Sequence, residues 1–277
     1  MPIRDLTTLE DFRRVVQLEK TIWGYTGESD DVVGVPILVV TVKRGGILLG
    51  AFDERDDLIG FVYSLPAIRH GRPSQWSHML GVLPGVRDAG LGTRLKFAQR
   101  NRALAMGIDL IEWTFDPLQA LNAHLNFVKL GVIVREYEKN IYGDSPSPLH
   151  RGAPTDRFVA EWWLRRPHVE RRVAPYADVT PRASEVFDAP QINTTRWSGE
   201  WLACVDQELE RPEPRLFVEI PANFGDMLRQ RPDVASEWRV KTRQIFTTYF
   251  TRGYRAVEFF FDRGAKTGRY LLARDER

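Results

Sequence analysis

Apolar and polar positions follow strand and helix periods in turn along the first part of the chain. Short apolar runs bounded by turn residues predict strands at Ile3–Leu6, Ile47–Phe52, Leu58–Leu65, Trp76–Leu83, Leu110–Phe115, Val132–Tyr137 and Arg157–Leu164. Apolar residues at helical spacing predict helices over Thr8–Trp23, Thr93–Met106 and Leu118–Leu130. The stretch Asp30–Lys43 fits a strand by its β-branched residues and a short helix by its end signals, and we take the helix. Strands interleaved with helices in this order indicate one α/β layered fold.

The C-terminal part shows a shorter alternation of the same kind. The patterns predict strands at Leu216–Ile220, Ala256–Phe261 and Arg269–Ala273, and a helix at Val234–Phe250. We interpret the basic residues of that helix as a solvated face rather than an anion site; they are Arg239, Lys241 and Arg243. The segment 167–195 is rich in proline and charge, which predicts a linker between a domain at 1–166 and a smaller α/β domain at 196–277. A decayed half-repeat of the first domain and chance similarity both stay open for the second.

Composition narrows the class of protein. Lys and Arg number 39 against 37 Asp and Glu, a net charge of +2. Proteins that bind a duplex concentrate positive charge because phosphate contacts dominate their affinity, so we expect no nucleic-acid partner. The single cysteine, Cys204, excludes a built-in disulfide or thiolate zinc site, and we expect no metal. The longest apolar run, Val32–Val42, is too short to span a membrane, and the N-terminus lacks a signal-peptide stretch, so we expect a cytoplasmic protein with no membrane partner.

The most informative stretch runs from His78 to Thr93, H-M-L-G-V-L-P-G-V-R-D-A-G-L-G-T. A strand that ends at Pro84 is followed by a turn with Gly90 and Gly92, which opens directly into a helix. Glycine allows a ligand to approach the backbone closely, and the free amides of a helix N-terminus bind phosphate. Arg87 adds a guanidinium for the same anion. The alternative is a glycine-rich turn without a ligand.

Two other phosphate-binding patterns fit less well. The chain lacks the G-x-x-x-x-G-K-[ST] pattern of a P-loop. The dinucleotide fingerprint requires a third glycine three residues after Gly92, where this chain has Leu95. Neither of these two phosphate-binding patterns therefore accounts for the turn.

The pattern V-x-P-x-x-R-x-x-G-x-G is formed by Val82, Pro84, Arg87, Gly90 and Gly92. It resembles the acyl-CoA signature of the GNAT superfamily of N-acetyltransferases, and the predicted element order resembles that family over about residues 1–165. The phrases at Ser77–Pro84 and Trp113–Gln119 resemble a little-characterised bacterial group of two-part GNAT proteins, linked loosely to N-acylation of amino acids. The resemblance implies a mixed α/β fold: a mostly antiparallel sheet with splayed central strands, flanked by helices, plus the smaller C-terminal unit.

The resemblance also implies acetyl-CoA or another acyl-CoA as co-substrate. The main chain of Leu80, Gly81 and Val82 would pair with the pantetheine arm where the fourth and fifth strands splay. The amides of the turn would hold the pyrophosphate, through Arg87, Asp88, Ala89, Gly90, Leu91, Gly92 and Thr93. Asn122 is a further candidate contact to the cofactor, with a helix-cap or surface role as the alternative.

The N-acyl transfer that the resemblance implies includes two proton transfers, and side chains are needed for both. Strand alternation places Trp76, His78, Leu80 and Val82 on one face, and a histidine at this place serves as the base in arylalkylamine N-acetyltransferases. The alternative for His78 is a hydrogen bond within the core. The usual general acid of the GNAT superfamily is a tyrosine, but this chain has Phe127 at the corresponding position. Tyr137, Tyr142 or a water could protonate the thiolate instead, the thiolate could leave unprotonated, or catalysis has been lost.

Four residues are candidates for contacts to the acceptor: Trp23, Asp116, Arg157 and Glu161. Core packing, turn formation and solvated charges are the alternatives for them. Together these expectations describe an N-acyltransferase that moves an acetyl or succinyl group to the amine of a small molecule or amino acid by direct attack. An acyl-CoA-binding regulatory or interaction module without turnover is the alternative, and Phe127 favours it. A monomer and a homodimer both stay open.

Overall fold

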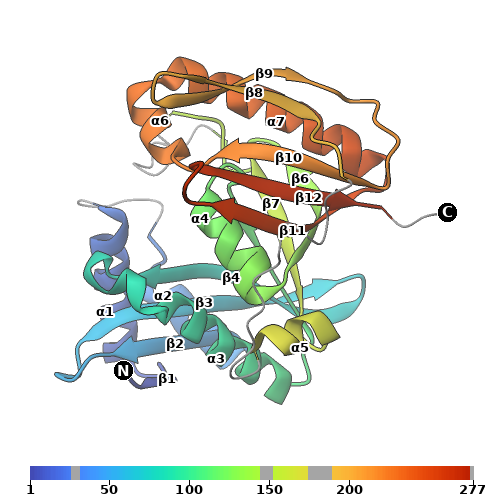
Figure 1. The fold of residues 1–277 in the computed structure, drawn as a ribbon. Helices are drawn as coiled ribbons and strands as arrows, with labels where there is room; N and C mark the ends of the chain where they lie inside the picture. The colour runs from blue at the N-terminus through green and yellow to red at the C-terminus, as the bar shows by residue number, and fades with distance from the viewer. Residues whose placement is uncertain (26–31, 144–151, 174–188, 275–277) are drawn as a thin grey trace. The chain divides into compact units, whose positions relative to one another are not determined.

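The computed structural model describes residues 1–25, 32–143, 152–173 and 189–274, without the side chains of 87–89 (Figure 1). The chain forms two compact units. The first comprises Met1–Trp113 with Trp163–Arg166, and the second comprises most of the chain from Thr114 onwards. This grouping differs from the division expected from the sequence, because residues 114–162 join the C-terminal residues rather than the N-terminal ones. The boundaries at 166 and 195 stay a prediction.

The first unit is a sheet with helices on both faces. Its elements are β1 (Ile3–Asp5), α1 (Leu9–Trp23), α2 (Val35–Lys43), β2 (Ile47–Phe52), β3 (Leu58–Arg69), β4 (Arg72–Val82), the 3₁₀ helix η1 (Pro84–Ala89), α3 (Leu91–Ala105) and the start of β5 (Leu110–Phe115). Strands β1 to β4 pair in sequence order and antiparallel, and β5 adds to β4 in parallel. Parallel pairing requires a crossover, which α3 supplies.

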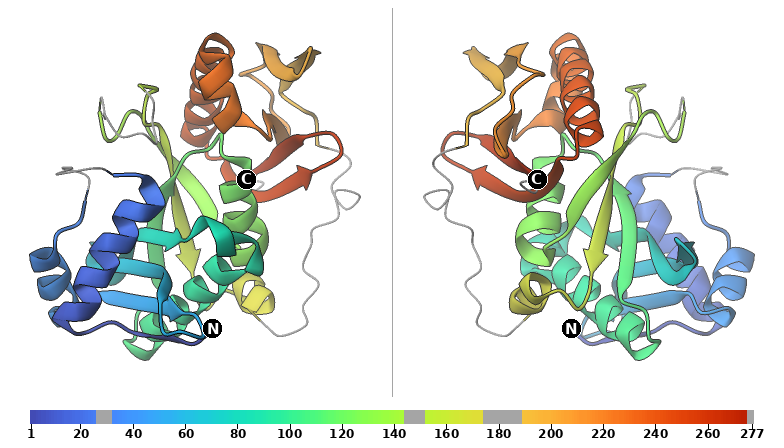
Figure 2. Two further views of the ribbon diagram at one scale, coloured as in Figure 1. Left: turned by 90° about the vertical axis from the view of Figure 1, so that its left-hand side faces the viewer. Right: turned by 90° about the vertical axis from the view of Figure 1, so that its right-hand side faces the viewer.

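Local signals explain why α1 begins and ends where it does. The Thr8 side chain accepts a hydrogen bond from the Asp11 amide, and the Asp11 carboxylate accepts one from the Thr8 amide, which is a complete capping box. Gly24 ends the helix at φ 72°, a left-handed value that favours glycine. Apolar residues of α1 and α2 pack on β2–β4 in one cluster, whereas α3 contacts the same strands from the other face (Figure 2).

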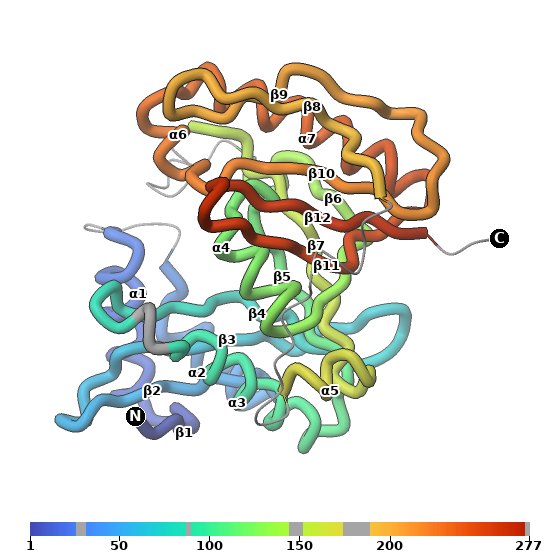
Figure 3. The backbone as a smooth tube through the Cα atoms, viewed as in Figure 1, coloured from blue at the N-terminus to red at the C-terminus, as the bar shows by residue number. Residues whose placement is uncertain are grey.

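The second unit is built on an antiparallel sheet. Its elements are the end of β5, α4 (Ala120–Ala123), the π-helix η2 (His124–Leu130), β6 (Ile133–Glu138), β7 (Arg157–Trp163), α5 (Pro167–Val173), β8 (Asn193–Ser198), β9 (Trp201–Gln207), β10 (Arg215–Pro221), α6 (Phe224–Gln230), α7 (Pro232–Thr251), β11 (Arg255–Asp262) and β12 (Thr267–Ala273). The strand order is β7-β6-β11-β12-β10, and β8 and β9 form a separate hairpin (Figure 3).

An aromatic cluster joins the strands and helices of this second unit. The ring of Phe158 on β7 lies 4.6 Å from Phe246 on α7, 5.4 Å from Tyr270 on β12 and 5.6 Å from Phe115 on β5, measured between centroids. These edge-to-face contacts suit the ring quadrupoles and bury large apolar areas. The C-terminal strands and helix therefore share one core with β5 and β7.

The mixed α/β fold with a mostly antiparallel sheet is confirmed. Asp30–Lys43 is helical from Val35 onwards, and the predicted helix Leu118–Leu130 becomes a short α-helix followed by a π-helix. The expected linker is wrong in part, because 167–173 form α5 and β8 begins at Asn193. None of the helices in the described ranges has the length and apolar character needed to cross a bilayer.

Candidate active site

The glycine turn before α3 has the geometry of an anion-binding helix start. Gly90 lies between η1 and α3 at φ 68°, in the left-handed region, and a Cβ added there would meet no atom within 4 Å. The first hydrogen bond within α3 runs from the Arg94 amide to the Gly90 carbonyl, so the amides of Leu91 to Thr93 precede that ladder. The first turn of α3 holds no acidic residue, and none of the described side chains caps it. The positive end of the helix dipole therefore favours a negatively charged ligand.

Strand β4 leaves its neighbour β5 early. The two strands pair at Gln75–Ile111 and Trp76–Glu112, whereas β4 continues to Val82. On the other side β4 stays paired with β3 as far as Val82 and Gly60. The pairing of β4 with β5 in the described part of the chain therefore ends at Trp76. Leu80, Gly81 and Val82 lie beyond that pairing, as expected for strands that part.

A β-bulge interrupts β4 at His78. Ser64 pairs with Ser77 and Tyr63 pairs with Met79, so His78 is the extra residue without a partner on β3. The bulge shifts the side-chain alternation: the Ser77 hydroxyl bonds with α3, while Met79 joins the cluster beneath α1. A regular strand would place both on the same face.

The prediction that His78 shares a face with Leu80 and Val82 is wrong for this reason. Leu80 points towards Gly92 of α3, whereas the His78 ring makes an edge contact with Tyr63, 6.1 Å between centroids, on the face covered by α1 and α2. The His78 side chain is exposed, and the protein around it lowers the pKa of His78 by desolvation. A neutral imidazole at neutral pH can accept a proton.

Two residues of α1 lie on that same face. Trp23 packs edge-on against Phe61, 6.0 Å between centroids, and lies next to Gly81. One turn earlier, Glu19 is 1% exposed; its Oε1 accepts a hydrogen bond from the Val33 amide at 3.1 Å, and its Oε2 has no partner in the described part of the chain. Burial raises the pKa of Glu19 to about 7. We did not predict Glu19 as a site residue, although it interrupts the apolar stripe of α1.

A buried lysine lies where β4 and β5 part. Lys96 of α3 is 2% exposed and donates hydrogen bonds to Ser77 Oγ at 3.1 Å and Gln99 Oε1 at 2.8 Å. Its Nζ lies 3.6 Å from the centroid of the Trp113 ring. Burial lowers the pKa of Lys96 well below its usual value. The sequence analysis did not single out Lys96 either, because it used only the apolar positions of this helix.

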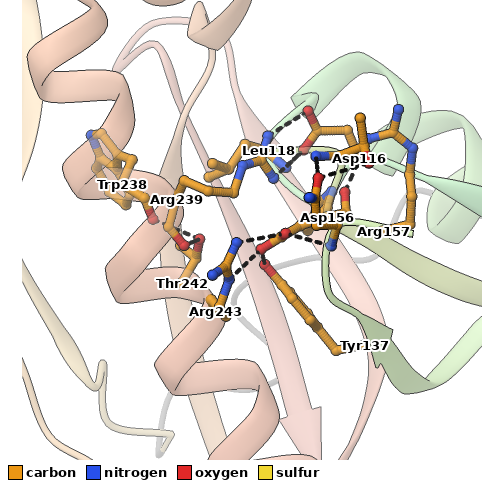
Figure 4. Close-up of polar contacts among 12 residues, drawn as sticks. Asp116, Leu118, Tyr137, Asp156, Arg157, Trp238, Arg239, Thr242 and Arg243 are labelled. Carbon is orange, nitrogen blue, oxygen red and sulfur yellow. Dashed lines mark hydrogen bonds and ion pairs between the residues drawn. The ribbon is translucent and has the colours of Figure 1, made fainter. Parts of the chain in front are cut away.

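In the second unit, arginines of α7 neutralise two carboxylates, Asp116, which is partly buried, and Asp156, which is fully buried (Figure 4). Both terminal nitrogens of Arg239 donate to Asp116, each at 2.8 Å, and the Leu118 amide donates to Asp116 Oδ1 at 2.9 Å. Burial opposes the ionisation of Asp116, but the adjacent guanidinium outweighs it and lowers the pKa of the carboxyl group. Asp116 was predicted to bind the acceptor amine, but both of its carboxylate oxygens accept hydrogen bonds from other residues of the protein.

The second carboxylate, Asp156, engages one of the candidate acids. The Tyr137 hydroxyl donates to Asp156 Oδ2 at 2.7 Å, and Arg243 donates to both carboxylate oxygens at 2.7 and 2.8 Å (Figure 4). Burial and the adjacent carboxylate raise the pKa of Tyr137. The interpretation of α7 as a solvated basic face is wrong for Arg239, which is 3% exposed, because two aspartates draw these arginines inward.

The remaining predicted residues of this unit differ in exposure. The Tyr142 hydroxyl bonds with Thr114 Oγ1 at 2.9 Å, and the Arg157 guanidinium lies over the Tyr142 ring at 5.6 Å. Glu161 is buried, with Arg135 at 3.8 Å. Asn122 is exposed on α4, and Phe127 is fully buried in the aromatic cluster.

The structure therefore gathers the predicted residues in two groups. The first unit holds the turn, the β4 edge, His78 and Trp23. The second unit holds Asp116, Tyr137, Tyr142 and Arg157. Of these, Asp116 pairs with Arg239, and Tyr137 donates to Asp156. The side chains of Arg87, Asp88 and Ala89 lie outside the described residues.

Comparison with known proteins gives a likeness to solved acetyltransferases. No protein-family model and no curated protein matches the chain. A GNAT-family protein of Desulfovibrio desulfuricans shares 17% identity, covering 59% of this chain and 98% of its own, with a TM-score of 0.46. YncA of Salmonella typhimurium, described as an acetyltransferase and solved with acetyl-CoA, shares 17% identity over 64% of this chain and 98% of its own, with a TM-score of 0.49.

A third similar structure is the ribosomal-protein-S18-alanine N-acetyltransferase of Escherichia coli. It shares 12% identity over 59% of this chain and 93% of its own, with a TM-score of 0.47. Similarity at this level assigns neither a substrate nor residue roles to this chain.

Proposed function

We propose that this protein is an acyl-CoA-dependent N-acyltransferase. The single observation that carries the proposal is the left-handed turn at Gly90, which begins α3 shortly after the part of β4 that lies beyond its pairing with β5. The N-terminus of α3 provides amides and a helix dipole that bind a diphosphate. The end of β4 provides main-chain groups that pair with the amides of a pantetheine arm. The spacing of Val82, Pro84, Arg87, Gly90 and Gly92 supports the same ligand.

These residues fit coenzyme A on the geometry of this chain. A Cβ added at Gly90 or Gly85 would meet no described atom within 4 Å, and the described atom that a Cβ at Gly92 would meet is Leu80 Cδ2, at 3.8 Å. The amides at the start of α3 would hold the diphosphate, and the β5-facing edge of Leu80–Val82 would pair with the pantetheine amides. Bound acyl-CoA would supply the activated thioester; the protein supplies position and proton transfer.

The bulge gives His78 two tasks on the acceptor side. Its imidazole accepts the proton that the attacking amine loses, and its low pKa keeps it neutral for this purpose. Its main-chain N–H, which the β3 register leaves out, is our candidate for the oxyanion donor. Trp23, next to Gly81, would line the acceptor side. The amine attacks directly, without an acyl-enzyme.

The acceptor is an amine of a small molecule or an amino acid, and the acyl group is acetyl or succinyl. Within the second unit, Tyr142 differs from Tyr137 because its hydroxyl meets a neutral threonine rather than a carboxylate. Asp116 contributes less than the sequence suggested, since Arg239 occupies both oxygens.

One observation favours a second function, acyl-CoA binding without turnover. Phe127 is buried where a tyrosine acid is expected, and Tyr137 is held by Asp156. Two measurements separate the candidates: calorimetry of CoA binding, and release of free thiol from acetyl-CoA and succinyl-CoA with a panel of amines. Thiol release that depends on an amine supports the transferase. Tight binding without turnover on any amine supports the binding module, and the absence of binding contradicts both.

A further inference from the structure

Lys96 is placed at the fork between β4 and β5. Trp76 and Glu112 are the last paired residues of the two strands, so Ser77 and Trp113 are the first residues beyond the pairing. Lys96 contacts both of them, with Nζ 3.1 Å from Ser77 Oγ and 3.6 Å from the Trp113 ring centroid. A charged amine is costly to bury, so an apolar residue of similar length would suit this packing position better.

The hydrogen bonds around Ser77 have a direction. Its Oγ accepts from Lys96 Nζ and from Gln99 Nε2, both at 3.1 Å. Within the described part of the chain, the one acceptor for the hydrogen of the Ser77 hydroxyl is Gln99 Oε1, at a long 3.4 Å, and that oxygen already accepts from Lys96 at 2.8 Å. The Ser77 hydroxyl is therefore a weakly engaged donor backed by a lysine.

We propose that Lys96 and Ser77 form a proton relay that protonates the thiolate leaving group. The inference rests on the proposed function, in which the thioester lies where the two strands part. It supplies the acid that Phe127 cannot supply.

The step balances as follows. The amine nitrogen bonds to the carbonyl carbon, the carbon–sulfur bond breaks, and the sulfur keeps the electron pair. Ser77 gives its proton to the sulfur and regains one from Lys96, which becomes a neutral amine and is recharged from solvent. His78 takes the proton of the attacking amine. Burial lowers the pKa of Lys96, which makes its ammonium group a stronger acid than that of an exposed lysine.

The first test measures binding rather than turnover. An ammonium group near the sulfur favours the thiolate, so wild-type protein should bind CoA at least about threefold more tightly at pH 8 than at pH 6. Desulfo-CoA, which has no thiol, should show no such rise. Lys96→Met should lose the rise while binding both ligands at pH 6 as the wild type does. An equal rise in Lys96→Met and wild type would overturn the relay. The absence of CoA binding by the wild type would instead overturn the proposed function.

The second test uses the leaving group. With acetyl-CoA, Lys96→Met and Ser77→Ala should lower kcat about 100-fold without raising the KM for acetyl-CoA. With an acetyl thioester of a nitrothiophenol, whose thiolate needs no proton, the loss should be under threefold. Equal losses with both donors would mark a structural role and overturn the relay. Lys43→Met, at the exposed end of α2, is the control. Ser77→Ala keeps the test decisive if the lysine variant does not fold.

Discussion

Arg239 of α7 donates two hydrogen bonds to Asp116, each at 2.8 Å, and its guanidinium is almost fully buried. A buried ion pair contributes little net stability, but removal of one partner leaves an uncompensated charge. We therefore expect Arg239→Leu to lower the free energy of unfolding by about 3–5 kcal/mol in urea denaturation.

Three further variants complete this test: Arg231→Leu, Asp116→Asn and a double variant. Arg231→Leu breaks an exposed pair with Asp233 and should cost far less stability than Arg239→Leu, because solvent screens an exposed pair. The double variant Arg239→Leu, Asp116→Asn should be more stable than the sum of the two single losses predicts, because no charge is left unpaired. Strict additivity would show that the two groups are not coupled.

Glu19 should make stability depend on pH. Its folded pKa of about 7 is raised above the ordinary value of 4.5, so the folded state binds its proton more tightly. Its contribution is fully present below about pH 4.5 and is lost as the pH rises to about 7. Glu19→Gln removes this titration, and the variant should gain up to about 3 kcal/mol on the wild type between pH 5 and pH 8. Glu10→Gln, at an exposed position of the same helix, is the control. A constant difference for Glu19→Gln would refute the placement.

His78 should control the acidic limb of the rate. Because its pKa is lowered, kcat/KM should rise through a pKa below about 6.5 and stay level above it. His78→Ala should remove that limb and lower the rate about 10²–10⁴-fold, with little change in CoA affinity. His70→Ala, in the turn between β3 and β4, should match the wild type. A loss under about threefold for His78→Ala would exclude it as the base.

The sequence predicts the strands and helices that have period and end signals of their own. Thr8, Asp11 and Gly24 define α1 through local hydrogen bonds, which depend on neighbouring residues only. The helix α5 inside the expected linker was not predicted, because distant residues hold it: Arg172 bonds with Val128 and with Glu258. Such contacts leave no signal in the local pattern.

The candidate site follows the same division. The turn at Gly90 is encoded locally, so its residues can be found by spacing alone. The face on which the His78 side chain lies cannot be found from spacing, because one extra residue in β4 relative to β3 reverses the alternation of side chains. Glu19 and Lys96 do leave a trace, because each is a charged residue at a position where its helix turns towards the sheet. Reading the apolar stripe for interruptions would have found both.

The most direct test compares two glycines of α3 in CoA binding. Gly90 and Gly107 lie at opposite ends of the helix, with φ of 68° and 76°, and neither would place a Cβ within 4 Å of another atom. Valine strains the backbone equally at both positions, so only the ligand distinguishes them. Calorimetry should find that Gly90→Val abolishes CoA binding while Gly107→Val binds as the wild type does, with both variants folded. Wild-type affinity in folded Gly90→Val would contradict the account.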